Sequence, residues 1–133
     1  MKRDLIISSQ LININKVRVL LQEVYQEYCL NMNSFNQVFL GISEAVHNAI
    51  VHGNKLNPEK NVSIRMNLSG NQFHVEVEDE GEGFLNPINF DPTFPENIKC
   101  ENGRGIYILR QLVGQLVFKD DGRKVFIQFN LPE

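Results

Sequence analysis

Two polar residues, Glu44 and Asn48, have the types and the spacing to do chemistry together. Residues four apart lie on the same side of an α-helix, so both side chains would project from one place. The carboxylate of Glu44 could take a proton from an attacking hydroxyl or water. The carboxamide oxygen of Asn48 is a hard ligand of the kind that suits Mg²⁺. Both side chains could instead simply face water, so the pair indicates a site only if other features support it.

A second candidate group begins at Asp79 and follows an alternating apolar segment; its sequence is Asp-Glu-Gly-Glu-Gly. The carboxylate of Asp79 accepts hydrogen bonds, and the amino group of adenine is a good donor. Gly81 and Gly83 let the backbone approach a ligand where a side chain would clash. We expect Glu80 and Glu82 to be solvated. The group is not a dinucleotide fingerprint, because a loop with prolines follows it instead of a helix.

The third candidate group is Gly103-Arg104-Gly105, at the predicted start of a helix. A helix start offers free N–H groups and the positive end of the helix dipole, which suit a phosphate. Arg104 could contact that phosphate, or it could be an ordinary surface arginine. No Gly-Lys-Ser/Thr phosphate loop is present in the sequence. Each group alone is weak evidence for a functional site. The specific signal is the order and spacing of all three groups in the chain.

Two helices are predicted from apolar residues that recur at three- and four-residue steps. The first runs over about residues 15–30, with Asn13 and Asn15 as candidate caps. The second is capped by Ser34 and carries Glu44, and it ends near Gly53 and Asn54, which are stop signals. The apolar stripes are Val17, Leu20, Leu21, Val24, Tyr25 and Tyr28 in the first helix, and Val38, Ile42, Val46, Ala49 and Ile50 in the second. We expect both stripes to be buried.

Alternating apolar and polar residues predict a hairpin of strands over 62–68 and 73–78. Residues 5–7 are predicted as an edge strand, and residues 116–131 as a second hairpin. Residues 84–102 have no periodicity and three prolines, which favours a long loop. A third helical stripe follows at Ile106, Leu109, Leu112 and Val113. This order predicts an α+β fold, a two-layer sandwich with three helices on one face of a mostly antiparallel sheet.

Length and composition bound the class of protein. The 133 residues are expected to form a single domain, residues 1–133. The net charge of −3 gives no sign of a basic nucleic-acid footprint, so no direct nucleic-acid partner is expected. The apolar segment near the amino terminus is too short for a signal peptide, and no run approaches the roughly 20 residues that span a bilayer. We therefore expect a cytoplasmic protein without a membrane partner. Cys29 and Cys100 are far apart in the chain and are expected to be reduced thiols.

With the three groups in this order, the chain resembles the Bergerat-fold ATPases, the GHKL or histidine-kinase-like group. Residues 44–48 look like the N box of that group, Glu-x-x-x-Asn, and residues 79–83 look like its first glycine box, Asp-x-Gly-x-Gly. Residues 103–105 look like the second glycine box. Within the group, residues 43–53 are most similar to the small bacterial anti-sigma factor serine/threonine kinases. The resemblance covers essentially the whole chain.

The resemblance implies ATP and Mg²⁺ as cofactors and a role for each site residue. Asn48 would coordinate the metal, Asp79 would bind the adenine amine, and residues 84–102 would be the ATP lid. The residues implied in binding Mg-ATP are Asn48, Asp79, Gly81, Gly83, Gly103, Arg104 and Gly105. Glu44 would be the general base that activates a serine or threonine hydroxyl on an anti-anti-sigma factor. In such families the unphosphorylated substrate competes with a sigma factor for the kinase, and the kinases are commonly homodimers.

Other interpretations stay open at this level. The chain could be a regulatory module that holds ATP to switch partner binding without phosphorylating anything, although the presence of Glu44 argues against it. It could also be the catalytic domain of a histidine kinase, although no phosphoacceptor-helix segment is present. His47 and His52 could line the site, but structural roles are favoured. They are five apart, so they do not share a face in the manner of a metal-binding pair.

Overall fold

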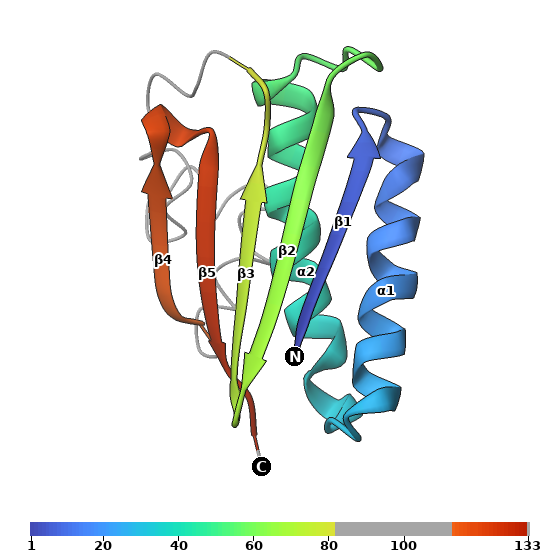
Figure 1. The fold of residues 1–133 in the computed structure, drawn as a ribbon, viewed down its shortest axis with the longest axis vertical. Coiled ribbons are helices and arrows are strands. Elements are labelled where there is room, and N and C mark those ends of the chain that lie inside the picture. Colours follow the sequence, from blue (N-terminus) through green and yellow to red (C-terminus); the bar gives the residue numbers. More distant parts are fainter. Residues whose placement is uncertain (82–112, 133) are drawn as a thin grey trace, which may run out of the picture.

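The computed structural model describes residues 1–81 and 113–132, which form a five-stranded antiparallel sheet with two α-helices packed on one face (Figure 1). The strand order is β1-β2-β3-β5-β4. The strands are β1 Lys2–Ser8, β2 Asn61–Ser69, β3 Gln72–Glu78, β4 Val113–Lys119 and β5 Lys124–Asn130. The helices are α1 Ile14–Glu27 and α2 Phe35–Asn48. The predicted α+β sandwich is confirmed, with β1 at one edge of the sheet.

Alternating burial along the strands confirms both predicted hairpins. In β2, β3 and β5 every second residue is apolar and almost fully buried, because it points at the helices. These residues are Val62, Ile64, Met66, Phe73, Val75, Val77, Val125, Ile127 and Phe129. The register aligns them across the sheet, so that Val75 lies opposite Met66 on one side and Ile127 on the other. The residues between them, which are polar apart from Phe126 in β5, face away from the helices.

The two helices bury most of the apolar stripes that their spacing predicts, but in α1 Leu20 is only partly buried and Tyr28 is exposed. In α2 the whole stripe is buried, and in α1 Tyr25 is buried and bonds through its hydroxyl to Ser34 Oγ at 2.8 Å. Tyr28 was predicted to be core, and that prediction is wrong because its side chain is 39% exposed. The helix ends at Glu27, and Cys29 takes a positive φ of 53°, so the helical periodicity no longer applies at residue 28.

The predicted side-chain caps of both helices are wrong. Ser34 precedes α2, but its hydroxyl donates to the carbonyl of Asn31 and caps nothing. A short 3₁₀ turn, Met32–Ser34, leads into the helix, and the Asn31 side chain accepts the N–H of Asn33 within that turn. Asn13 precedes α1, but its carboxamide donates to Ser8 at the end of β1. Both side chains are used to fix the connections between elements.

The carboxyl-terminal hairpin begins earlier than expected. Val113 was assigned to a third helical stripe, but it is the first residue of β4 and pairs with Phe129. A register shift follows at Gly114, between Val113 and Gln115. The rest of the predicted third helix and the predicted loop 84–102 lie outside the described residues. Within residues 1–81 and 113–132, no helix is long and apolar enough to cross a membrane.

Candidate functional site

Glu44 lies in the middle of α2 and is buried. The rest of the helix is largely apolar, and only 7% of the Glu44 residue surface is exposed. This excludes the interpretation in which the side chain faces bulk water. Burial disfavours the charged form of a carboxylate, and it raises the pKa of Glu44 to about 7. A carboxylate with this pKa is matched to proton transfer at neutral pH.

Asn48 is the last α-helical residue of α2, one turn beyond Glu44, and it is partly buried. The helix does not stop there but continues as a π-helix, Ala49–Gly53. The N–H of Asn54 donates to the carbonyl of Ala49 at 2.8 Å, which is the wider spacing of a π-turn. A π-turn contains an extra residue, so it changes the direction in which the following residues point. Gly53 and Asn54 consequently reach the end of β3.

The Asp79 turn, residues 79–81, follows β3 directly and is held by hydrogen bonds. Asp79 is buried, and its Oδ1 accepts the N–H of Gly81 at 2.8 Å. The N–H of Asp79 donates to the carbonyl of Arg123, just before β5, at 2.9 Å. Burial raises the pKa of Asp79, while the Gly81 N–H and the positive charge of Arg123 oppose that rise. Glu80 is exposed, as predicted.

Gly53 lies directly against the Asp79 carboxylate. A Cβ atom on Gly53 would stand 2.4 Å from the carboxyl carbon of Asp79, which is closer than real Cβ atoms come to other atoms. A Cβ atom on Gly81 would stand 1.9 Å from the carbonyl oxygen of Gly53. A side chain at Gly81 would collide with the backbone of Gly53, and one at Gly53 would collide with the Asp79 carboxylate, so glycine suits both positions. The end of α2 and the Asp79 turn therefore form one continuous structure.

Asn54 is a buried residue next to the candidate site whose contacts sequence reasoning missed. It was interpreted as a helix stop signal, but its side chain is fully buried and makes three hydrogen bonds. Its Nδ2 donates to Ser9 Oγ at 2.8 Å and to the carbonyl of Asn61 at 3.0 Å. Its Oδ1 accepts the N–H of Glu80 at 2.8 Å. An asparagine after a helical glycine carries no local signal that would separate such a bridge from an ordinary stop.

The structure brings four of the predicted site residues onto two adjoining elements, α2 and the Asp79 turn. They are Glu44, Asn48, Asp79 and Gly81. Gly83, Gly103, Arg104 and Gly105 lie outside the described residues, as does the predicted lid. His47 has a buried Nδ1 atom with no hydrogen-bond partner among the described residues. Its predicted structural role stays a prediction, as does that of His52.

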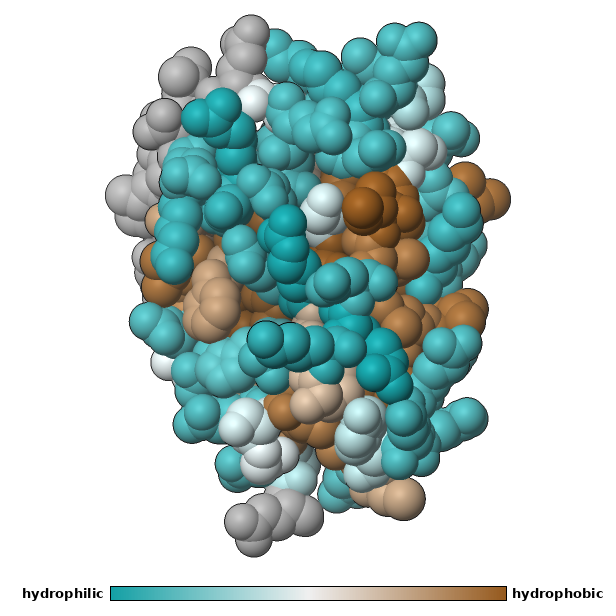
Figure 2. All heavy atoms as spheres, in the orientation of Figure 1, coloured by the Kyte–Doolittle hydropathy of each residue, from teal (hydrophilic) through white to brown (hydrophobic). Residues whose placement is uncertain are grey.

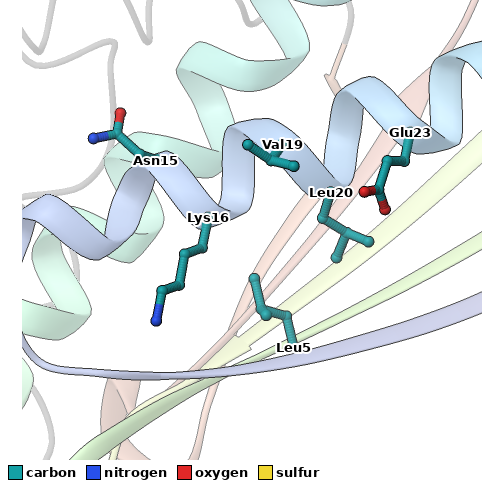
Figure 3. A pocket seen from close by; sticks show the side chains of 6 residues that line it. All are labelled: Leu5, Asn15, Lys16, Val19, Leu20 and Glu23. Atoms are coloured by element: carbon teal, nitrogen blue, oxygen red, sulfur yellow. The ribbon is translucent and has the colours of Figure 1, made fainter.

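An apolar groove of about 410 Å³ lies elsewhere, between β1 and α1 (Figure 3). The residues that line it are Leu5, Asn15, Lys16, Val19, Leu20 and Glu23. In Figure 3 the side chains of Leu5 and Leu20 point toward each other across it. None of its lining residues belongs to the α2 end or to the Asp79 turn, so the groove is separate from the candidate site.

Comparison with known proteins gives a family and a set of distant relatives. Residues 7–129 match the family described as the histidine kinase-like ATPase domain. The chain is 28% identical to the anti-sigma F factor of Geobacillus sp. (strain WCH70) over 95 residues, 70% of this chain and 65% of that protein. It is 26% identical to the serine-protein kinase RsbW of Bacillus subtilis (strain 168) over 108 residues, 75% of this chain and 66% of that protein. The matched region spans slightly less than two thirds of these relatives.

The family match includes both helices and most of the described sheet, but only the last two residues of β1. Glu44, Asn48, Asp79 and Gly81 all lie inside the matched range. The resemblance that the three motifs indicate is thereby confirmed at the level of the family, and the antiparallel sheet with helices on one face agrees with it. The chain belongs to the histidine kinase-like ATPase domain family.

Proposed function

We propose that residues 1–133 form a single domain that binds Mg-ATP and phosphorylates a serine or threonine of an anti-anti-sigma factor. The same domain would bind a sigma factor and so regulate transcription. The observation that carries the proposal is Glu44, a buried carboxylate whose pKa is about 7, one helical turn from Asn48. The relatives named anti-sigma F factor and serine-protein kinase RsbW support the regulatory and the kinase parts of the proposal.

The Asp79 turn fits the adenine end of ATP. Oδ1 of Asp79 already accepts the Gly81 N–H, and the carboxylate can accept a further hydrogen bond from an exocyclic amino group. Gly53 and Gly81 keep side chains away from this place, since a Cβ atom on either would collide with the turn. Asp79 would therefore select a base that presents an amino group, and the backbone would lie close to it.

Asn48 fits Mg²⁺ as a single protein ligand. No cluster of three or more His, Cys, Asp or Glu side chains that could cage a metal occurs in residues 1–81 and 113–132. Mg²⁺ is usually held by one or two protein oxygens together with phosphate oxygens and waters, which is the arrangement that a lone carboxamide allows. When bound, the metal would neutralise charge on the phosphates.

Glu44 would act on the protein substrate. Its carboxylate would accept the proton of the substrate hydroxyl as the oxygen attacks the terminal phosphorus, and the bond from that phosphorus to the leaving ADP oxygen would break. Since burial raises the pKa of Glu44 to about 7, both its ionised and its protonated form are accessible at neutral pH.

Transfer of labelled phosphate from ATP to a purified anti-anti-sigma protein tests the proposal. Glu44→Gln is expected to lower the rate by about 100-fold or more while ATP still binds. Asn48→Ala is expected to remove the Mg²⁺-dependent part of the ATP affinity. Glu59→Gln is the control, because this carboxylate is exposed and lies outside the predicted site residues. ATP binding without any transfer by the wild type would favour the ATP-dependent switch over the kinase.

A further inference from the structure

We propose that Asn54 is a positioning residue for the nucleotide, because its buried carboxamide fixes the Asp79 turn from outside. The inference rests on the proposed ATP binding and adds a residue to it. Asn54 does not belong to any of the three motifs, and its side chain binds the turn through the backbone N–H of Glu80. Its role would be to hold Asp79 in the orientation that receives the adenine amine.

Each successive N–H of the Asp79 turn has its own acceptor. The Asp79 N–H donates to the carbonyl of Arg123, and the Gly81 N–H donates to Asp79 itself. The Glu80 N–H, between them, donates to Oδ1 of Asn54 at 2.8 Å. Among these acceptors, Asn54 supplies the one side chain that comes from outside the turn. Without it, the peptide between Asp79 and Glu80 would lose the bond that fixes its rotation.

The orientation of the Asn54 carboxamide is determined by its partners. Its nitrogen faces the carbonyl oxygen of Asn61, and its oxygen faces the N–H of Glu80. A flipped amide would place oxygen against oxygen and nitrogen against nitrogen. Ser9 Oγ donates to the carbonyl of Lys60 at 2.7 Å, so it is free to accept from the Asn54 nitrogen. Asn54 therefore joins the end of β1, the start of β2 and the turn after β3 in one defined geometry.

The neighbouring residue makes this bridge part of the site. Gly53 touches the Asp79 carboxylate, and Asn54 follows it directly in the chain. The π-helix brings both residues to the turn, with the Asn54 N–H bonded to Ala49. The helix that carries Glu44 and Asn48 is thus connected to the base-binding turn through Gly53 and Asn54. A preformed turn binds its ligand more tightly, because no ordering of the turn is needed on binding.

The first test is hydrogen exchange in the unliganded wild type. Glu80 is exposed, and the amide of an exposed turn residue ordinarily exchanges quickly. We expect the Glu80 amide to exchange slowly by NMR, and to exchange faster in Asn54→Ala than in Ser9→Ala. Ser9→Ala is the matched control, because it removes a partner of Asn54 and leaves the bond to Glu80 in place. Fast exchange of Glu80 in the wild type would overturn the inference.

The second test is nucleotide affinity by calorimetry. Asn54→Ala is expected to weaken ATP, ADP and AMP alike by about tenfold, because the effect acts at the base, whereas Ser9→Ala leaves them unchanged. In an Asp79→Ala background, adding Asn54→Ala is expected to cause no further loss of nucleotide affinity. If the double variant instead loses affinity by the sum of the two single effects, Asn54 acts independently of Asp79 and the inference is overturned. Failure of the wild type to bind adenine nucleotides would instead overturn the proposed function and this role with it, while the exchange data would still report whether Asn54 holds the turn.

Discussion

At the scale of single residues, Glu44 determines how the protein responds to pH. The proposed base must be ionised to accept a proton, and burial raises its pKa to about 7. We expect kcat/KM for phosphate transfer to rise with pH and to level off above pH 7, since this ratio reports the pKa of the free enzyme. A profile that is flat between pH 5.5 and 8.5 would be inconsistent with Glu44 as the base.

The same carboxylate makes stability depend on pH without any substrate. The pKa of Glu44 rises from 4.5 in the unfolded chain to about 7 in the folded protein, so between these pH values Glu44 is protonated in the folded state and ionised in the unfolded state. The free energy of unfolding is therefore not reduced by Glu44 at low pH, and it falls as the pH rises through about 7. Glu44→Gln removes that loss and is expected to stabilise the protein at pH 8 by up to about 3 kcal/mol.

Urea unfolding of the wild type and Glu44→Gln at pH 5 and pH 8 measures this difference. We expect the two proteins to be closer in stability at pH 5 than at pH 8. Glu80→Gln serves as the control, because an exposed carboxylate should change the pH dependence little. A gap between the wild type and Glu44→Gln that does not widen with pH would show that burial does not perturb Glu44.

At the scale of elements, the contact between the π-helix and the Asp79 turn depends on glycine. Gly53→Ala would place a methyl group 2.4 Å from the Asp79 carboxyl carbon, so either the turn or the helix end must move. We expect a loss of about 1–3 kcal/mol in stability and at least tenfold weaker ATP binding. The measurements are urea unfolding and calorimetry on the same preparation.

Gly70→Ala is the matched control for that substitution. Gly70 lies in the turn between β2 and β3 with a φ of +60°, and nothing lies within 4 Å of a Cβ atom there. An alanine at this φ costs about 1–2 kcal/mol through backbone strain alone. We expect Gly70→Ala to lose stability and to keep its ATP affinity, and a parallel loss of affinity would mean that general destabilisation explains the effect of Gly53→Ala.

The sequence predicts features that depend on neighbouring residues better than contacts between residues far apart in the chain. The alternation in β2, β3 and β5 and the stripe of α2 are predicted because periodicity reports burial directly. Val113 was missed because a short apolar segment does not distinguish a helix end from a strand start. Glu44, Asn48, Asp79 and Gly81 are recognisable as motifs. The contact of Gly53 with Asp79 and that of Asn54 with Glu80 join residues 26 apart and leave no local signal.

At the scale of the whole molecule, the edge of the sheet at β1 is where we expect a second copy to bind. Figure 2 shows a hydrophobic area over β1, and Ile6 in that strand is 65% exposed. Beside it lies the apolar groove of Figure 3, where Val19 is 52% exposed. An edge strand with unpaired backbone groups beside exposed apolar side chains favours association.

Light scattering after gel filtration tests that expectation. The wild type should form a dimer, and Val19→Asp should be a monomer that keeps its ATP affinity. Met32→Asp is the control, because Met32 is similarly exposed but does not line the groove. A monomeric wild type, or equal effects of the two substitutions, would place any self-association elsewhere.

The strand order has a consequence for the protein during its synthesis. β5 comes after β4 in the chain, yet it lies between β3 and β4 in the sheet. The Asp79 N–H also takes its acceptor from Arg123, immediately before β5. Residues 123–130 must therefore leave the ribosome before β3 can pair with β5. The Asp79 turn likewise gains its hydrogen bond to Arg123 only after that point. Until translation has passed this point, the proposed nucleotide site lacks the hydrogen bond that anchors the Asp79 turn.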